Sequence, residues 1–266
     1  MSPEKRPVLG EPLLPAERQQ RILETIRSDS AIRVSALSRL FGVTTMTIRR
    51  DLDALEQKGL IDRTHGGAMS RQGAALDEFR YRTSAMKNPQ LKRRIARRAS
   101  AMIDPDDIVF LGEGTTPALL MRHCDPALGF KIFSNNVGAL LEASDKAVEF
   151  ILLGGRYRSA SQALWGRVTL EIIAQVHAGK TFLSADGLSI EAGMTTQNEE
   201  IAAVDRQMIR YTRGRVILMA DHTKIGRVGR YVISPAATID VLVTDPGTSP
   251  EFRKRLESLG VQVVIA

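Results

Sequence analysis

Hydrophobic and polar positions follow two different periods along the 266-residue chain. Residues 16–69 contain apolar positions at helical spacing, with capping residues between them and a Gly-Gly turn near the end. Residues 70–106 are polar and rich in Arg and Lys, and residues 107–266 alternate short β-branched or apolar runs with helical stretches. This last pattern is typical of βαβ units around a mostly parallel sheet. The chain therefore predicts a small helical domain followed by a larger α/β domain.

The boundaries of these parts are placed where the composition changes. Residues 1–15 are Pro-rich and lack the apolar stretch of a signal peptide, so they predict a disordered arm. We expect a helical domain over residues 16–70, a linker over 71–90 and the α/β domain over 91–266.

Seven short runs in the α/β part predict strands. They are Ile108–Leu111, Phe130–Phe133, Phe150–Leu153, Lys180–Ala185, Arg215–Ala220, Val241–Thr244 and Val261–Ile265. Several are followed by small or polar residues, namely Gly112–Thr116, Ser134–Asn136, Gly154-Gly155, Asp186-Gly187 and Asp221–Lys224. Because ligands of open α/β sheets bind outside the carboxyl ends of the strands, we expect these residues to form parts of one ligand site.

The first two helices of the N-terminal domain are expected to be short and amphipathic. Glu17–Arg27 places Ile22, Leu23 and Ile26 on one face, with Arg18 and the other polar residues elsewhere. Ser35 is expected to cap the second helix, which carries an apolar stripe and ends at Gly42.

The third helix has the most complete capping pattern. Thr44 is expected to be its N-cap, with Val43 and Ile48 closing a hydrophobic staple over it. Ile48, Leu52 and Leu55 recur at helical spacing and predict the buried face. The outward positions are Thr45, Met46, Arg49, Arg50 and Asp53.

Helix, Gly-containing turn and helix at this length predict a helix-turn-helix, whose second helix fits the DNA major groove. Residues 60–68 then predict a hairpin, or wing, with Gly66-Gly67 at its tip. The residues expected to contact DNA are Ser35, Thr44, Thr45, Thr47, Arg49, Arg50, Arg63 and His65. An alternative is that Arg49-Arg50 is only a solvated face of a small structural bundle, because basic pairs on helices are common.

Composition narrows the function classes. The formal net charge of +7 favours polyanionic partners, with nucleic acid first. A lone cysteine, Cys124, excludes an intramolecular disulfide framework and suits a reducing, cytoplasmic compartment, where we expect it to be a structural thiol. No CxxC or HxxxH spacing occurs and no apolar run reaches the length of a membrane span, so we expect no metal, no cofactor and no membrane partner.

The third helix and the wing carry a resemblance to a known family. The sequence V-T-T-M-T-I-R-R-D-L at 43–52, followed by R-T-H-G-G-A at 63–68, resembles the DeoR family of transcriptional regulators. The resemblance implies a winged helix-turn-helix that binds double-stranded operator DNA, usually as a repressor.

The same resemblance extends to about Asp245. The segments that carry it are Gly114-Thr115-Thr116, Ser134-Asn135-Asn136, Leu153-Gly154-Gly155, Ala185-Asp186-Gly187, Gly193-Met194-Thr195-Thr196 and Ala220-Asp221-His222-Thr223-Lys224. They imply a sensor domain similar to sugar-phosphate isomerases of the ribose-5-phosphate type. The usual ligands of this domain are phosphorylated sugars or polyols, which relieve repression.

The residues expected to contact such an effector are Gly114, Thr115, Thr116, Asn135, Gly154, Gly155, Asp186 and Lys224. Two hydroxyls and free amides at the start of a helix make an anion site, and Asn and Asp can hydrogen-bond sugar hydroxyls. Structural alternatives stay open. Asn135 can cap the next helix, Gly154-Gly155 can be a tight turn, and Lys224 can pair internally with Asp221.

Two positions depart from the family pattern. Gly112 stands where an Asp is frequent, two positions ahead of Gly114, which leaves the hydroxyl contacts of the effector open. Ser134 stands where Thr is more frequent.

The basic segment from Arg80 to Arg98 contains no acidic residue and predicts an amphipathic helix that begins near Asn88 or Pro89. Its basic face could track DNA phosphates, or it could be a solvated helix that opens the sensor domain.

Three possible functions can be compared against these features of the sequence. The first is a ligand-responsive repressor of a carbohydrate or polyol operon, acting as a homodimer or tetramer. The second is a sugar-phosphate isomerase, in which Asp186, Glu199, Glu200 and Lys224 would serve, although the Lys loop and paired-acid segment of those enzymes do not occur here. The third, RNA binding, lacks the interleaved aromatic residues that stack bases. The sequence favours the first function, without catalytic residues.

Overall fold

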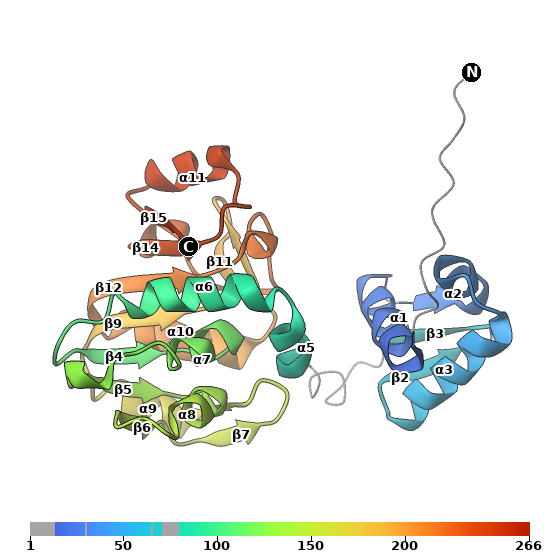
Figure 1. Ribbon diagram of the computed structural model, residues 1–266, viewed down its shortest axis with the longest axis horizontal. Coiled ribbons are helices and arrows are strands. Elements are labelled where there is room, and N and C mark those ends of the chain that lie inside the picture. Colours follow the sequence, from blue (N-terminus) through green and yellow to red (C-terminus); the bar gives the residue numbers. More distant parts are fainter. Residues whose placement is uncertain (1–13, 30, 65, 71–79) are drawn as a thin grey trace. The chain divides into compact units, whose positions relative to one another are not determined.

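The computed structural model describes residues 14–29, 31–64, 66–70 and 80–266. The chain divides into two compact units between Asp77 and Glu78 (Figure 1). Each unit is described separately below.

The N-terminal unit contains three helices and a small sheet within its described residues. Its elements are α1 (Pro15–Asp29), β1 (Ala31–Arg33), α2 (Val34–Phe41), α3 (Thr45–Gln57), β2 (Ile61–Thr64) and β3 (Gly67–Ser70). The antiparallel sheet has the order β1-β3-β2. One apolar core joins all three helices to the sheet and includes Ile22, Ile26, Leu37, Ile48 and Leu52. The predicted winged helix-turn-helix is confirmed.

Two local expectations in this unit are wrong. Ser35 is not the N-cap of α2 but lies inside the helix, because strand β1 leads directly into it and Arg33 is the cap residue. The backbone N–H of Val34 donates to the carbonyl of Gly66 at 2.9 Å, so the wing takes the place of a capping side chain. Gly67 lies in β3 and not in the turn, where a Cβ atom would come within 2.3 Å of the Ile32 carbonyl oxygen. This close approach of two strands requires glycine.

Residues 80–100 form two helices of the C-terminal unit, α5 (Arg80–Met86) and α6 (Pro89–Ser100). The range expected to be a linker is therefore helical from Arg80 onward, while residues 71–79 lie outside the described residues. Residues 1–13 of the expected arm also lie outside them, and Pro15 begins α1.

The main sheet of the C-terminal unit has seven strands, all parallel, and every predicted strand is present in it. The strands are β4 (Ile108–Leu111), β5 (Lys131–Ser134), β6 (Glu149–Leu152), β9 (Ala178–Leu183), β12 (Thr212–Met219), β14 (Val241–Thr244) and β15 (Gln262–Ile265). Their order is β15-β14-β12-β9-β4-β5-β6. The predicted α/β class is thus confirmed.

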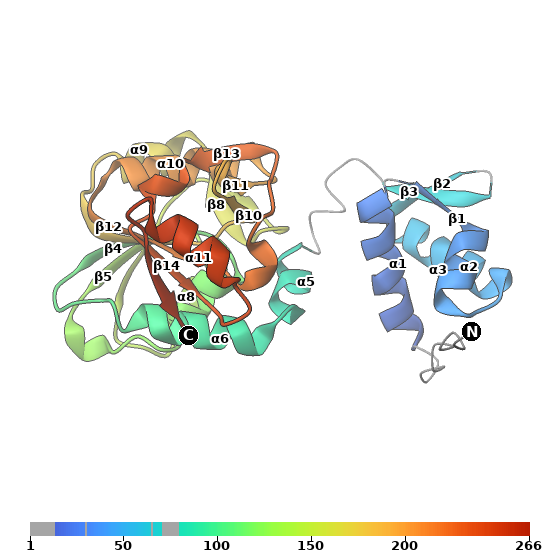
Figure 2. The same cartoon turned by 90° about the horizontal axis from the view of Figure 1, so that it is seen from above.

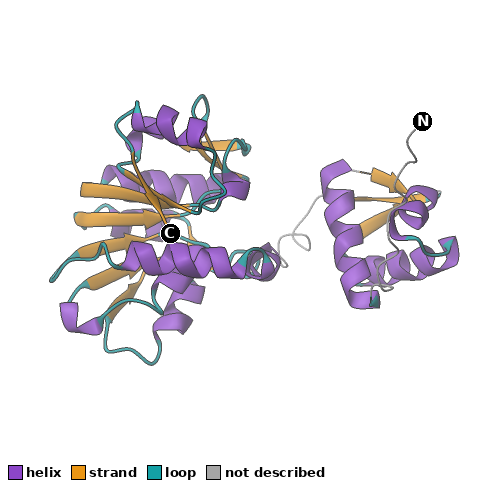
Figure 3. Cartoon of the chain, turned by 45° about the horizontal axis from the view of Figure 1, so that its top comes forward, coloured by secondary structure: helices purple, strands orange, loops and turns teal. Residues whose placement is uncertain are grey.

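Helices cover both faces of this sheet (Figures 2 and 3). One apolar core lies under α6, α7 (Thr115–Leu120) and α8 (Val137–Ala143) and includes Ile95, Leu120 and Ile132. A second core lies under α9 (Arg167–Ile173), α10 (Glu199–Arg210) and α11 (Pro250–Glu257) and includes Met208 and Leu256. Figure 2 shows α9 and α10 on one side of the sheet and α6 on the other.

Two smaller sheets escaped the sequence prediction. A hairpin joins β7 (Arg156–Arg158) to β8 (Ala163–Trp165), and an antiparallel sheet joins β10 (Gly187–Ser189), β11 (Gly193–Thr196) and β13 (Tyr231–Ser234). Their strands have three or four residues each, which is too short for an apolar period to stand out.

The strand order reverses between β4 and β9. From β4 the chain builds outward through β5 to β6, and from β9 it builds the other way through β12 to β15. Such a reversal opens a crevice beyond the carboxyl ends of the two central strands, which is where open α/β sheets bind ligands. The loops that follow β4 and β9 are Gly112–Gly114 and Ser184–Asp186.

Candidate functional site

Helix α3 is held by a complete N-terminal cap. The Thr44 hydroxyl accepts a hydrogen bond from the backbone N–H of Thr47 at 3.1 Å and lies 3.0 Å from the Thr47 hydroxyl. Ile48, Leu52 and Leu55 are buried, and Val43 packs against the same core. The predicted cap and the predicted buried face are both confirmed.

The opposite face of α3 is open to solvent. The exposed residues are Thr45, Met46, Arg49, Arg50 and Asp53, as the helical period predicts, while Thr47 is half-buried. Two arginines and a threonine hydroxyl thus project from the first two turns of the helix. Such groups reach phosphates and base edges when a helix lies in the major groove.

A buried ion pair fixes α3 to α1. Arg18 Nε donates to Asp51 Oδ2 at 2.6 Å, and Arg18 Nη2 donates to Asp51 Oδ1 at 3.2 Å. The two residues are only 8% and 3% exposed. Arg18 was expected on the polar side of its helix, so this prediction is wrong. The helical period alone predicts that the Arg18 guanidinium lies in solvent. It can be buried because the Asp51 carboxylate supplies its counter-charge and hydrogen bonds.

The wing arginine is engaged within the unit. Arg63 Nη1 lies 3.2 Å from the Asp53 carboxylate and 3.4 Å from the Arg49 carbonyl oxygen. It therefore ties β2 to the exposed side of α3. His65, the other wing residue expected to contact DNA, lies outside the described residues.

Four polar loops of the C-terminal unit follow neighbouring strands of the main sheet. Gly112–Thr116 follows β4, Ser134–Asn136 follows β5, Ser184–Asp186 follows β9, and Ala220–Lys224 follows β12. We call their side chains, together with those that contact them, the strand-end cluster. Because β12, β9, β4 and β5 are consecutive in the sheet, these four loops lie at the same edge of it, and their use as one ligand site stays a prediction.

The loop that starts α7 is fixed from the neighbouring strand. Asn136 Nδ2 donates to the carbonyl oxygens of Gly112 and Gly114 at 3.2 and 2.9 Å. Gly114 has φ of 115° and a Cβ there would come within 2.5 Å of Ser184 Oγ, so only glycine fits. Thr115 and Thr116 are buried at the first positions of α7.

Lys92 lies at this loop, although the sequence places it among the basic residues of α6. Its ammonium donates to Thr115 Oγ1 at 3.0 Å, to Ser84 Oγ at 3.1 Å and to the Ser84 carbonyl. Ser84 Oγ in turn lies 3.3 Å from Thr115 Oγ1. Lys92 is only 4% exposed, and burial together with the charge of Lys224 lowers its pKa to about 8. The positive charge of this ammonium lies beside the N-terminus of α7, where the helix dipole also favours negative charge.

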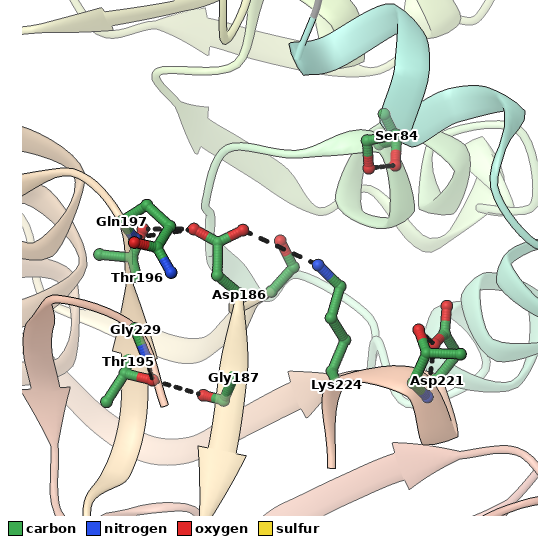
Figure 4. A network of polar contacts seen from close by, with 12 residues as sticks. Ser84, Asp186, Gly187, Thr195, Thr196, Gln197, Asp221, Lys224 and Gly229 are labelled. Atoms are coloured by element: carbon green, nitrogen blue, oxygen red, sulfur yellow. Dashed lines mark hydrogen bonds and ion pairs between the residues drawn. The ribbon is translucent and has the colours of Figure 1, made fainter. Parts of the chain in front are cut away.

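Asp186 and Lys224 face each other across the cluster, with Thr196 and Gln197 on the far side of the carboxylate (Figure 4). Asp186 Oδ2 accepts from the Gln197 N–H at 2.8 Å and from Thr196 Oγ1 at 3.0 Å, while Oδ1 lies 3.8 Å from Lys224 Nζ. The internal partner of Lys224 is therefore Asp186 and not Asp221. Asp221 instead accepts from the Thr223 N–H at 2.9 Å and from Asn88 Nδ2 at 3.4 Å.

Asn135 is 1% exposed, and its amide is only half satisfied. Asn135 Nδ2 donates to the Leu164 carbonyl at 3.0 Å, whereas Oδ1 has no partner among the described residues. The cap of α8 is Asn136, whose Oδ1 accepts from the Ala139 N–H, so the alternative role of Asn135 as a cap does not hold.

Gly154-Gly155 forms a turn packed on α9. Thr169 Oγ1 donates to the Gly154 carbonyl at 2.6 Å, and a Cβ on Gly155 would come within 2.3 Å of Thr169 Oγ1. Gly155 also has φ of 137°. These contacts give the two glycines a structural role.

Sequence reasoning missed Lys92 because it is one of five basic residues on α6. It also missed Ser84, which lies on α5. The separating signal was the helical period. Lys92 is spaced with Ile95, Ala96 and Ala99 on the buried face, while Arg93, Arg94, Arg97 and Arg98 are exposed. The exposed arginines fit a solvated helix that opens the sensor domain.

Neither a metal cluster nor a membrane-spanning helix is found in the described part of the chain. Among those residues no group of three or more His, Cys, Asp or Glu side chains could hold a metal ion. None of their helices is long and apolar enough to cross a membrane. Cys124 is buried and donates to the Leu120 carbonyl at 3.3 Å, and burial raises the pKa of its thiol to about 12.

Comparison with known families accounts for both units. Residues 18–73 match the DeoR-like helix-turn-helix domain, and residues 87–246 match the DeoR C terminal sensor domain. The chain belongs to the DeoR family of transcriptional regulators. It is therefore a DNA-binding regulator and not an enzyme.

Similar members of the DeoR family span nearly the whole chain. A putative aga operon transcriptional repressor of Escherichia coli O157:H7 is 32% identical over 254 residues, covering 94% of this chain and 93% of that protein. The HTH-type transcriptional regulator GlpR of Haloferax volcanii is 32% identical over 252 residues, covering 95% and 98%. The HTH-type transcriptional repressor GlcR of Bacillus subtilis is 30% identical over 251 residues, covering 94% and 95%.

Solved structures of similar arrangement include a D-ribose-5-phosphate isomerase in complex with phospho-erythronic acid. It is 16% identical, with a TM-score of 0.38 over 53% of this chain and 55% of that chain. A tetrameric eIF2B-beta2-delta2 complex from C. thermophilum is 14% identical, with a TM-score of 0.47 over 92% of this chain and 87% of that chain.

Proposed function

We propose that this DeoR-family regulator represses an operon for the catabolism of a carbohydrate or polyol and that a phosphorylated sugar or polyol releases it from its operator. The observation that carries the proposal is the buried ammonium of Lys92 at the start of α7, 3.0 Å from Thr115 Oγ1. Two relatives, one named as a putative repressor of the aga operon and one as the transcriptional repressor GlcR, support the proposal that this protein represses an operon.

The phosphate would bind at the cationic end of the strand-end cluster. The start of α7 offers the hydroxyls of Thr115 and Thr116, and Lys92 and Lys224 supply two positive charges. The two ammonium groups repel each other, and this repulsion contributes to the lowered pKa of Lys92. A phosphate dianion bound to both groups would relieve this repulsion, which would favour binding of an anion.

The hydroxyl-bearing carbons would lie toward Asp186 and Asn135. Asp186 presents Oδ1 to Lys224 at 3.8 Å, a separation at which a ligand hydroxyl can compete for either group. The unpaired Oδ1 of Asn135 is a buried acceptor, and such a group costs about 1–3 kcal/mol until a donor reaches it. Gly154 and Gly155 stay outside this proposal because their contacts are structural.

Release from DNA would begin at α5. Lys92 donates hydrogen bonds to the Ser84 carbonyl, Ser84 Oγ and Thr115 Oγ1, so it joins α5 and α7. A phosphate that takes Lys92 must displace some of these bonds and loosen α5 from α7. Because α5 follows the segment that connects the two units, its movement would alter the domain arrangement and lower operator affinity.

The DNA-bound form would be a homodimer or a dimer of dimers in the cytoplasm. Two copies of α3 would enter successive major grooves about 34 Å apart on a near-palindromic operator. Thr45, Arg49 and Arg50 would contact bases or phosphates, Thr44 would act mainly as the cap, and Ser35, Thr47 and Arg63 would support the backbone contacts.

A thermal-shift panel of sugar and polyol phosphates on the purified protein tests the effector class. We expect one or a few phosphorylated compounds to raise Tm, whereas the matching unphosphorylated sugars leave it unchanged. The matched control is Lys92→Met, which should lose the shift, beside Arg93→Met on the exposed face of the same helix, which should keep it. A shift from a free sugar, with none from any phosphorylated compound, would overturn the proposal.

A further inference from the structure

Asp205, on α10, is a buried carboxyl that the fold does not satisfy. It is only 2% exposed, and neither a hydrogen bond nor an ion pair of its carboxyl is found among the residues that the structure describes. Burial raises its pKa well above the ordinary range, and the charges of Glu113 and Asp186 raise it further, against the opposing effect of Arg206. Burying a carboxyl without a hydrogen-bond partner lowers the free energy of unfolding. Core packing therefore does not explain why Asp205 stands at this position.

The Asp205 carboxyl lies beside Gly112. A Cβ atom on Gly112 would come within 3.3 Å of Asp205 Oδ1 and 2.6 Å of Leu183 Cδ2. The absence of a side chain at Gly112 therefore leaves room for the Asp205 carboxyl beside the carboxyl end of β4. This place lies two residues ahead of Gly114, at the reversal of the strand order.

The neighbours of Asp205 belong to the strand-end cluster. Glu113 precedes Gly114 in the loop after β4, and Asp186 follows β9. Both carboxylates act on Asp205 through space, and Lys224 acts on Lys92. Lys92 and Lys224 thus offer ammonium groups to a phosphate, and Asp205, Glu113 and Asp186 offer carboxyl groups to hydroxyls. The two sets meet where Asp186 Oδ1 lies 3.8 Å from Lys224 Nζ.

We propose that Asp205, which lies on α10 beside Gly112, binds a hydroxyl group of the effector. The inference rests on the proposed function, because it takes the effector to be a phosphorylated sugar or polyol. A carboxyl group accepts from a hydroxyl and, when protonated, also donates to one, so it can fix both the position and the direction of a hydroxyl. Lys92 and Lys224 would then select phosphorylated compounds, and Asp205 would discriminate among those compounds by their hydroxyl groups.

Two substitutions separate this role from a purely structural one. Asp205→Asn keeps the shape of the side chain and one acceptor, and Asp205→Ala removes all hydrogen bonding. The matched control is Glu199→Gln, which makes the same carboxyl-to-amide change at an exposed position of the same helix. Inorganic phosphate serves as a second probe, because it can occupy the cationic end without reaching Asp205.

Isothermal titration calorimetry measures the affinity of each variant for the panel compound that the wild type binds most tightly. We expect its affinity to fall about fivefold in Asp205→Asn and about tenfold or more in Asp205→Ala, with inorganic phosphate affinity and Glu199→Gln unchanged. Should Asp205→Ala fail to fold, the fivefold loss in Asp205→Asn decides alone.

Affinities within twofold of the wild type in the folded variants would overturn the role of Asp205 and leave the proposed function standing. If the wild type binds no phosphorylated compound, the proposed function fails, and the role of Asp205 fails with it. An equal loss for the polyol compound and for inorganic phosphate would also overturn the inference, because it would mark a general disturbance of the site.

Discussion

The ammonium of Lys92 lies 3.0 Å from the hydroxyl of Thr115, the first residue of α7. The two residues come from different helices on one face of the sheet, and Lys92 also holds the Ser84 hydroxyl of α5 at 3.1 Å. One buried cation thus connects three helices at the end of strand β4.

The protonation of Lys92 predicts how effector affinity depends on pH. Its lowered pKa, about 8, means that the free protein loses this charge in mildly alkaline solution. A bound phosphate dianion raises that pKa, so affinity is full below about pH 8 and is lost as the pH rises above it. Titration calorimetry at about pH 7 and about pH 9 should show a severalfold weaker affinity at the higher pH. Lys92→Arg, which stays charged, should show no such decline, and a flat profile in the wild type would contradict the assignment.

The Arg18–Asp51 pair predicts a large loss of stability when one partner is removed. Asp51→Asn should destabilise the N-terminal unit by about 3–5 kcal/mol, because the buried Arg18 guanidinium loses the charge of the Asp51 carboxylate. Amide hydrogen exchange in α1 and α3 of the full chain measures this directly. Asp53→Asn, at an exposed position of the same helix, should change protection little. Equal protection in both variants would show that the buried pair contributes nothing.

The exposed arginines of α3 predict the strength of DNA binding. Arg49→Ala and Arg50→Ala should each weaken operator binding by about 1–3 kcal/mol, or roughly 5- to 160-fold, with effector affinity unchanged. A mobility-shift titration provides the measurement. Arg94→Ala, on the exposed face of α6, should bind DNA as the wild type does. If Arg94→Ala weakens binding and the α3 variants do not, the DNA-contacting surface has been assigned to the wrong helix.

The buried carboxyl of Asp205 predicts an unusual effect on stability. Since its folded-state pKa is raised, the folded protein holds a proton that an unfolded Asp loses near pH 4, and stability falls as the pH rises through this window. Asp205→Asn should therefore raise Tm at neutral pH, and its advantage should shrink as the pH approaches 4. Thermal melting beside Glu199→Gln checks this. A lower Tm for Asp205→Asn at neutral pH would make Asp205 a structural residue.

Much of the architecture could be predicted from the sequence. The seven strands of the main sheet stand out because both faces of a parallel sheet are buried, which produces short continuous apolar runs such as Val241–Thr244. Thr44 could be identified as a cap because side-chain capping is a local property. The convergence of the strand-end loops followed from topology alone.

What escaped prediction depends on contacts between distant segments. Ser35 is not a cap because the wing, more than 30 residues away, supplies the Gly66 carbonyl to Val34. Arg18 of α1 forms an ion pair with Asp51 of α3. Asp205 of α10 lies beside Gly112, which belongs to the loop after β4. A helical period separates exposed from buried positions, but it does not tell which buried polar residue has a partner.

The most direct test of the account is the release of DNA by the effector in the wild type and in Lys92→Met. Fluorescence anisotropy with a labelled duplex from the region upstream of the gene would follow binding, while the most stabilising phosphorylated compound is titrated in. The account predicts weaker DNA binding by Lys92→Met than by the wild type without the compound, because the bonds from Lys92 to α5 are already absent. It also predicts that at least about tenfold more compound is needed to release the DNA that Lys92→Met still binds than to release the wild type or Arg93→Met. Release of Lys92→Met at the wild-type concentration, or no release of the wild type by any phosphorylated compound, would contradict it.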